Sequence, residues 1–590
     1  MATKHAKVDV VTIGAGWTSA IIGAKLCPKG RDVVALEQGP QRWGYPDFAH
    51  DHDSLRYSGR YAMMVDLSRE TWTWRPSPDK PALPMRQYGS FNPGEGLGGA
   101  AVHWSGQLWR FMETDFNHRS YVVERYGAKR LPAGSTIQDW PVKYDELEEY
   151  YDAFEYDIGA SGIAGNLRGE IQPGGNPFEA PRQRPYPHPP LGTNRFADIF
   201  AAGCDKLGLH PFPQPAGILS RAWTDPFGNH RSGCLYCGFC TRFGCEVDAK
   251  SSPQTTHLPV ALATGRYDVR LGCKVLRIET GGDGRATGVT YVDGQGEEHF
   301  QPAELVLVSA FTLENNRLLL LSKGGKHPNG VGNDRGRVGK NYTYQIYPAP
   351  IVGLFEGEKL NMYMGNTCTI NIIYDYNGDN FDHSDLDFIG GMQLYSEPCE
   401  REPFNSVKGL TTEDGKSWGA AWKQQLGRDW DSYASIVTEG ESIPYEDQFV
   451  DLDPHYTDKF GNPLLRISFD WHDNEKKMWR FVAKRAQEIM AAMKPTRVVK
   501  FQPEIPAYNI HDYQSTHPTG GCIMGTDPGT SVTNGYGQVW DTPNVFVTGA
   551  ALFPQNPGAN PTGTIGALTY RTAEALLDRW FDDPDELLES

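Results

Sequence analysis

Apolar runs alternate with glycine-rich turns over the first forty residues of the chain. Val8–Ile13 has the apolar pattern of a buried strand and runs into a turn that contains Gly14 and Gly16. An apolar helical segment follows to about Leu26, and a second apolar strand ends at the acid Glu37. Short apolar runs bounded by turn residues are typical of buried strands. The order strand, helix, strand predicts the opening βαβ unit of a parallel sheet.

Later apolar runs predict the rest of the fold. Buried strands are expected at 268–271, 288–292, 305–309 and 544–550. A helix is expected from Phe311 to Leu321, and residues 340–505 are expected to form mainly an antiparallel sheet with helices. Together these elements predict an α+β protein, with a Rossmann-like α/β domain and a second domain built on an antiparallel sheet.

The first glycine turn has the composition of a dinucleotide-binding site. Gly14 and Gly16 let the backbone approach a pyrophosphate, whose charge the N-terminus of the next helix attracts. Glu37 can hold a ribose hydroxyl. Ser19 stands where a third glycine is usual, and it is small enough for close packing of helix on strand. A fortuitous glycine turn is the alternative, but strand, helix and acid all have the expected spacing.

A second glycine-rich segment, Gly94–Gly106, is too rich in glycine for the interior of a helix or strand. It includes Gly98, Gly99, His103 and Trp104. Such a loop suits a backbone that lies against a flat, charged ligand. The sequence therefore predicts a second contact with the bound nucleotide.

Two polar residues near the C-terminus, His517 and Asn560, are candidates for chemistry. The strand at 544–550 precedes Asn560 and ends in small residues at Ala550. A lone histidine is often only a satisfied loop residue, and Asn560-Pro561 is also an ordinary turn signal. These alternatives stay open on the residues alone.

Four cysteines, Cys234, Cys237, Cys240 and Cys245, lie within twelve residues. Soft thiolates select zinc, copper(I) or iron–sulfur clusters, and a tight consecutive run of this kind is an iron–sulfur arrangement. A two-pair zinc site would separate its CxxC units by a longer excursion. A disulfide-linked or merely crowded loop is the remaining alternative.

Composition narrows the classes of function. The 590 residues carry 56 basic and 73 acidic side chains, a net charge of −17, without a basic stripe for nucleic acid. No apolar run approaches the length needed to span a bilayer, so membrane attachment is expected only through partners. The N-terminus enters the first strand without an apolar leader, which predicts folding in the cytosol. The 15 tryptophans offer stacking faces for sugar rings.

These motifs together resemble the glucose–methanol–choline (GMC) family of FAD oxidoreductases over essentially the whole length. The segments that carry the resemblance are Cys234–Lys250, Tyr513–His517 and Phe553–Gly563. Within the family the chain is most similar to the gluconate 2-dehydrogenase flavoproteins and related sugar and glucoside dehydrogenases. The resemblance implies a discontinuous FAD-binding domain (1–115, 196–340 and 506–590, with an iron–sulfur loop at 230–250) and a substrate domain (116–195 and 341–505).

The resemblance also implies roles for the candidate residues. His517 would accept a hydroxyl proton while a carbinol hydride moves to the flavin, and Asn560 would hydrogen-bond the same hydroxyl. His103 matches the position of covalent flavin attachment, with a histidine that only hydrogen-bonds near the flavin as the alternative. The expected cofactor-binding residues are Gly14, Gly16, Ser19, Glu37, Gly98, Gly99, His103, Trp104, Ala550, Pro561 and Thr562.

The cysteine run matches a segment that holds an iron–sulfur cluster in the resembling dehydrogenases. A [3Fe-4S] cluster, which needs three cysteines, is preferred over [4Fe-4S]. The expected partners are a small subunit that carries the export signal and a multihaem cytochrome c, which would place the chain at the periplasmic face of the inner membrane, with the cytoplasm as the alternative. The expected substrate is a sugar, sugar acid or glycoside. A flavin oxidase using O₂ and a non-redox lyase on the same scaffold are the competing functions.

Overall fold

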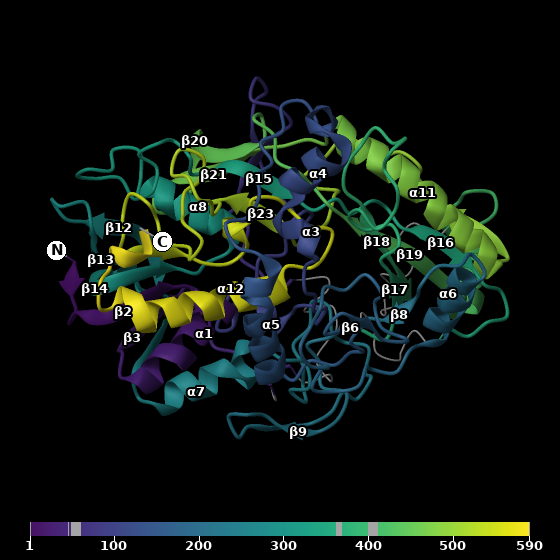
Figure 1. The fold of residues 1–590 in the computed structure, drawn as a ribbon, viewed down its shortest axis with the longest axis horizontal. Coiled ribbons are helices and arrows are strands. Elements are labelled where there is room, and N and C mark those ends of the chain that lie inside the picture. Colours follow the sequence, from purple (N-terminus) through teal and green to yellow (C-terminus); the bar gives the residue numbers. More distant parts are fainter. Residues whose placement is uncertain (1, 45–46, 49–60, 361–367, 399–410, 589–590) are drawn as a thin grey trace.

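A computed structural model describes residues 2–44, 47–48, 61–360, 368–398 and 411–588 (Figure 1). The first sheet has eight strands and contains the predicted βαβ unit. Its main strands are, in sheet order, β11 (Tyr267–Leu271), β3 (Val33–Glu37), β2 (Val8–Ile13), β14 (Glu298–Val308), β13 (Ala286–Val292) and β12 (Lys274–Thr280). Two more strands, β1 (Thr3–Lys4) and β24 (Val545–Val547), also pair with β14.

The parallel part of this sheet runs from β11 to β14 and includes β24. Every residue of β3 is buried, as expected of a strand that is covered on both faces. The helix α1 (Trp17–Leu26) packs against α7 (His257–Ala263) and α12 (Thr562–Ala575). The opening of the chain therefore forms the parallel unit that its apolar pattern predicts.

The second sheet has six strands, and every pair in it is antiparallel. Its order is β22 (Arg497–Lys500), β16 (Ile351–Leu354), β19 (Tyr433–Gly440), β18 (Met392–Pro398), β17 (Asn371–Ile373) and β8 (Phe212–Pro213). The helices α6 (Arg195–Asp205) and α11 (Asp473–Met493) pack on it and lie on its side away from the first sheet (Figure 1). The predicted antiparallel sheet is thus confirmed.

Smaller elements complete the fold. The additional strands are β4 (Thr73–Arg75), β5 (Leu83–Pro84), β6 (Asn166–Leu167), β7 (Glu170–Ile171), β9 (Trp223–Thr224), β10 (His230–Arg231), β15 (Lys340–Tyr344), β20 (Phe449–Thr457), β21 (Pro463–Ser468) and β23 (Pro518–Gly521). The additional α-helices are α3 (Glu113–Phe116), α4 (His118–Tyr126), α5 (Tyr144–Ile158), α8 (Thr312–Leu321) and α10 (Gly419–Asp429). None of the helices in the described part of the chain is both long and apolar enough to cross a bilayer.

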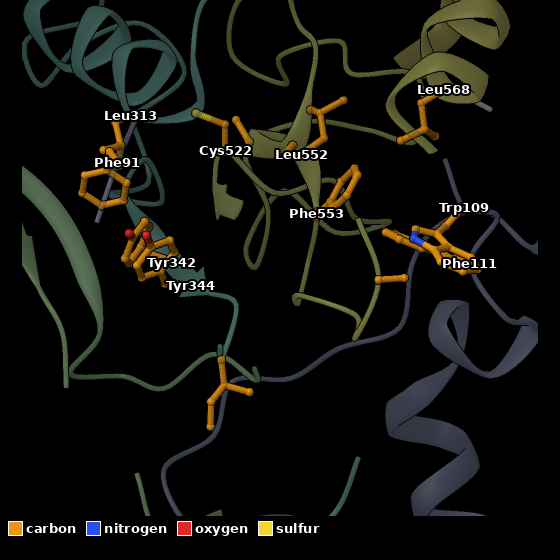
Figure 2. Packing of buried hydrophobic residues seen from close by; sticks show 14 of the residues in the cluster. Phe91, Trp109, Phe111, Leu313, Tyr342, Tyr344, Cys522, Leu552, Phe553 and Leu568 are labelled. Carbon is orange, nitrogen blue, oxygen red and sulfur yellow. The ribbon is translucent and has the colours of Figure 1, made fainter. Parts of the chain in front are cut away.

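The two sheets share one hydrophobic core. It joins Val306 of β14 with Leu394 of β18, and Figure 2 shows Phe111 close to Phe553 within it. The rings of Phe111 and Phe553 meet edge to face, with 5.6 Å between their centroids. Because both sheets contribute to one core, residues from distant parts of the chain can surround a common site between them. The division into the two discontinuous domains stays a prediction.

Candidate active site

A cavity of about 680 Å³ lies where the glycine segments meet the second sheet. The candidate residues in its wall come from the two glycine segments, the acid that follows the first of them, and the late motifs, whereas none of the four clustered cysteines is in it. They are Gly14, Gly16, Glu37, Gly98, Gly99, His103, Trp104, His517, Ala550, Asn560, Pro561 and Thr562. Ser19 is not in this wall. Its hydroxyl lies between Thr12 Oγ1 (2.6 Å) and Tyr267 OH (2.7 Å), so it ties α1 to β2 and β11.

The nucleotide end of the cavity is a glycine cradle. Gly14 has a φ of +96°, and a Cβ there would come within 2.9 Å of the Ser309 carbonyl oxygen. A Cβ on Gly16 would find no atom nearer than the Gly98 oxygen at 4.0 Å, so this face is open toward the cavity. Backbone N–H groups next to open space at a helix N-terminus suit a pyrophosphate. The cradle therefore fits the phosphates of FAD.

Glu37 joins the two glycine segments. Its carboxylate accepts hydrogen bonds from the backbone N–H groups of Ala15 (3.1 Å), Gly39 (2.9 Å) and Gly96 (3.2 Å). Burial raises the pKa of Glu37, and the three donors oppose that rise. Besides facing the ligand, this acid holds the turn at 14–16 against the loop at 94–99.

His103 stands in the wall with a buried, unpaired nitrogen. Its Nε2 makes no hydrogen bond with the described part of the chain. Burial, and secondarily the positive charge of Lys250, lowers the pKa of His103 to about 3, so the ring is neutral. The indole of Trp104 donates to the Ser251 carbonyl oxygen at 2.8 Å. A neutral imidazole beside the cavity has the nucleophilic lone pair that covalent flavin attachment requires.

His517 and Asn560 meet directly at the other end of the cavity. The Asn560 Nδ2 lies 3.3 Å from the His517 Nε2. Asn560 comes just before α12, and the backbone carbonyl of His517 accepts a hydrogen bond from Asn556 Nδ2 at 2.7 Å. The two residues predicted from the late motifs therefore form one pair, although 43 positions separate them.

Trp109 determines how this pair is protonated. Its indole N–H, which can only donate, reaches the Asn560 Oδ1 at 2.8 Å and so points the Asn560 amide nitrogen at His517. The His517 Nε2 must then accept, which places the ring proton on Nδ1, beside the Gln345 Oε1. Burial lowers the pKa of His517 to about 4. His517 is therefore neutral near pH 7 and can act as a base through Nε2.

Trp109 and Gln345 have no signal in the sequence analysis. They contact Asn560 and His517 across 451 and 172 positions, respectively. A buried ion network in the cavity wall is equally invisible in the sequence: Lys274 Nζ and Arg317 Nη1 both contact Glu70 Oε1, at 2.6 and 2.8 Å. Only an alignment of relatives or the fold itself could have found these residues.

We expect Trp109→Phe to lower the rate constant of flavin reduction by about tenfold, within the range for a misplaced catalytic group. The substitution keeps an aromatic ring but removes the indole N–H, which frees the Asn560 amide to rotate. Anaerobic stopped-flow measurement of flavin reduction checks this, with Trp140→Phe as the control because that buried tryptophan lies outside the cavity wall. Equal rates in Trp109→Phe and the wild type would show that the indole does not orient Asn560.

The cysteine loop lies against the flavin side of the cavity. Thr241 and Arg242, between the third and fourth cysteines, are part of the wall, and the Arg242 N–H donates to the His103 carbonyl oxygen at 2.8 Å. Among the described residues, no disulfide joins any of the four cysteines of the run. Within the same described residues, no three His, Cys, Asp or Glu side chains are grouped as a metal site.

Two family models match the chain, both described as GMC oxidoreductase, over residues 141–347 and 444–569. The chain is 38% identical to the gluconate 2-dehydrogenase flavoprotein of Pantoea cypripedii, over 100% of this chain and 97% of that protein. It is 28% identical to the 2-methyl-1,2-propanediol dehydrogenase of Mycolicibacterium austroafricanum (99% and 98% covered) and 24% identical to the fructose dehydrogenase large subunit of Gluconobacter japonicus (98% and 99%).

Solved structures agree on the fold. Pyridoxine 4-oxidase from Mesorbium loti superposes with a TM-score of 0.59 at 15% identity, over 96% of this chain and 99% of that one. A formate oxidase variant from Aspergillus oryzae gives 0.62 at 13% identity, over 98% and 99%. The chain belongs to the GMC oxidoreductase family and has its fold. It is an FAD-dependent oxidoreductase that acts on CH–OH donors.

The site geometry explains how such a donor is handled. When bound, FAD supplies the acceptor for a hydride, and the glycine cradle and Glu37 would hold its phosphates and ribose. The geometry would allow the Nε2 of His517 to take the proton of a substrate hydroxyl, and the second N–H of Asn560 to orient that hydroxyl. Gln345 and Trp109 hold both groups from behind, so the one change needed before proton transfer is that the Asn560 N–H gives up its contact with Nε2.

Proposed function

We propose that the protein is a dehydrogenase that oxidises a hydroxyl carbon of a sugar, sugar acid or glycoside and releases electrons through an iron–sulfur cluster to a cytochrome c. The observation that carries the cluster is the setting of Lys250. Its ammonium is buried and donates only to backbone carbonyl oxygens, those of Trp104 (2.6 Å), Cys240 (2.7 Å) and Phe243 (2.7 Å).

Among the described residues, no carboxylate lies within ion-pair distance of Lys250. The ionisable side chains that interact electrostatically with its ammonium are the thiols of Cys237, Cys240, Cys245 and Cys368. An unpaired buried ammonium costs several kcal/mol. A thiolate-ligated iron–sulfur cluster is anionic and would offset that cost. The donor chemistry therefore fits a cluster, [3Fe-4S] in preference to [4Fe-4S], although the thiols would have to turn toward one another on loading.

The cysteine loop also makes the contacts expected of a path by which electrons leave the flavin. Lys250 bridges the carbonyl oxygens of Trp104 and Cys240, and Arg242 bonds to His103, so the flavin side of the cavity and the cysteine run are joined by direct hydrogen bonds. A flavin reduced by a hydride holds two electrons, and a cluster accepts them one at a time. This arrangement supports a dehydrogenase over an oxidase, which does not need the cysteine run.

We further propose that FAD is attached covalently through His103. The orphaned, neutral imidazole in the wall supports this. Acid-precipitated protein is then expected to retain its yellow colour, whereas His103→Ala should release the flavin into the supernatant. His230→Ala is the control because His230 lies on the exposed side of β10. Complete release of flavin from the wild type would leave His103 as a hydrogen-bonding residue only.

We propose the partner subunits from the similarity of this chain to its relatives. One relative is named as the large subunit of a fructose dehydrogenase, so chains of this kind occur in assemblies. A small subunit that carries an export signal and a multihaem cytochrome c would bring the chain to the periplasmic face of the inner membrane, with the cytoplasm as the alternative location. Co-expression with both candidates, followed by fractionation and co-purification, tests the assembly.

Anaerobic absorbance of the flavin tests the function. We add D-gluconate and then an alkyl glucoside to the purified protein. Bleaching by either substrate supports a sugar dehydrogenase, and product analysis then identifies the oxidised carbon. Substrate-dependent peroxide in air would indicate an oxidase instead, and turnover with a flavin that stays oxidised would indicate a lyase.

A further inference from the structure

One face of the second sheet forms the cavity wall beyond the catalytic pair. Side chains on a strand alternate between its two faces, so Gln393, Tyr395 and Glu397 of β18 share a face. Tyr395 and Glu397 line the cavity, and so do Ser435 and Glu439 of the neighbouring β19. The sheet therefore presents a row of polar groups to the substrate.

The strand register places charges along this wall. Glu397 is opposite Ser435, Ser435 is opposite Val352, and Val352 is opposite Lys500, so one row crosses four strands. Glu439 stands four positions from Ser435 on the same strand. Within the described part of this wall, Glu397 and Glu439 supply two carboxylates, and Lys500 supplies the single cation.

Glu439 is the more buried of the two acids, with 4% of its surface exposed. Its Oε2 accepts a hydrogen bond from the Gln393 amide at 2.7 Å, and its Oε1 accepts one from the Tyr395 hydroxyl at 3.0 Å. No lysine, arginine or histidine among the described residues forms an ion pair with it. Each carboxylate oxygen keeps a further lone pair that can accept from a ligand.

Hydrogen bonds also connect the surroundings of Glu439 to the segment that supports the catalytic pair. The Gly440 N–H donates to the Ile346 carbonyl oxygen at 2.9 Å, which joins β19 to the segment that contains Gln345. The Tyr395 hydroxyl lies 3.3 Å from that of Tyr347, which also lines the cavity. A substrate whose reacting carbon is at His517 would therefore extend its remaining groups toward Glu439.

We propose that Glu439 determines substrate specificity, an inference that rests on the proposed function. Its carboxylate accepts hydrogen bonds from the hydroxyls of a neutral sugar or glycoside. With Glu397 it would repel the carboxylate of a sugar acid. The phenol ring of Tyr347, which is only partly buried and lines the cavity, can pack against a pyranose ring, which suits the same class of substrate. Neutral carbohydrate, rather than sugar acid, is thus the substrate class of this site.

The test compares Glu439→Gln with the wild type on methyl or octyl glucoside and on D-gluconate. It is run at about pH 8, because burial raises the pKa of Glu439 to about 7 and the acid is ionised above that value. Anaerobic flavin reduction gives kcat/KM, and perturbation of the flavin spectrum gives Kd. We expect the wild type to prefer the glucoside. In Glu439→Gln, the ratio of glucoside to gluconate kcat/KM should fall by about tenfold or more, the effect of removing one nearby like charge, mainly through KM.

Two further variants separate specificity from folding. Glu439→Asp retains the charge and should retain most of the selectivity. Glu441→Gln removes a buried acid on the same chain segment that does not line the cavity, so its ratio should stay at the wild-type value. A wild type that prefers gluconate, or an unchanged ratio in Glu439→Gln, overturns the inference while sugar oxidation stands. If no sugar reduces the flavin, the proposed function itself is wrong and the inference fails with it.

Discussion

Replacing His517 with alanine is expected to lower the rate constant of flavin reduction by about 10³-fold, within the range for removal of a general base. The substitution removes the nitrogen that we propose takes the substrate proton, while Trp109 still holds Asn560. Anaerobic stopped-flow absorbance at saturating substrate checks this. Flavin content and the melting temperature serve as controls for folding.

The same residue predicts the pH dependence. Burial lowers the pKa of His517 to about 4, so the base is protonated and inactive below that pH and neutral above it. We expect kcat/KM to rise tenfold per pH unit below about 4 and to level off above it, unless the protein unfolds first. A wild-type inflection near 6.5, the ordinary histidine value, would show that the ring is solvated in the working enzyme.

The second large effect concerns the electron exit. In Cys240→Ser we expect the iron content to fall and the electron paramagnetic resonance signal of the cluster to disappear. Turnover with cytochrome c should drop to background, because the reduced flavin then has no cluster to accept its electrons one at a time. Anaerobic bleaching of the flavin by substrate should remain at the wild-type rate, because Cys240 is outside the cavity wall.

The matched control is Cys204→Ala. Cys204 is a buried free thiol on α6, and it lies outside the cysteine run. That variant should keep its iron, its resonance signal and its turnover with cytochrome c. Anaerobically purified wild type without iron would contradict the cluster proposal, and equal cytochrome c reduction by Cys240→Ser would remove the cluster from the electron path.

The local pattern of apolar residues and glycines was sufficient to predict several helices and strands of the fold. The strand at Val8–Ile13, the turn at Gly14 and Gly16, and the strand that ends at Glu37 are all present as predicted, and so is the helix at Thr312–Leu321. Each depends on the burial of neighbouring apolar residues and on backbone freedom at glycine, which are properties of short segments. The antiparallel second sheet was predictable for the same reason.

Contacts between side chains that are far apart in the sequence could not be predicted from local patterns. Ser19 was expected at the nucleotide, but its hydroxyl bonds to Thr12 and Tyr267, because only the folded chain places β11 beside α1. The sequence contains no periodicity that connects Lys250 with Trp104 across 146 positions. Such polar contacts need a single partner at one distance and angle, and that geometry exists only once the core has formed.

The sequence alone determined the family, the βαβ nucleotide motif, the acid at its end, and the histidine, asparagine and cysteines that carry the proposed chemistry. These features are residue types at short spacings, which the chain states directly. Only the tertiary structure decided that the Trp109 indole donates to Asn560, that burial lowers the pKa of His517, and that Glu439 lines the cavity. The physical reason is that proton position, burial and charge balance depend on what surrounds a side chain, and those surroundings come from residues hundreds of positions away.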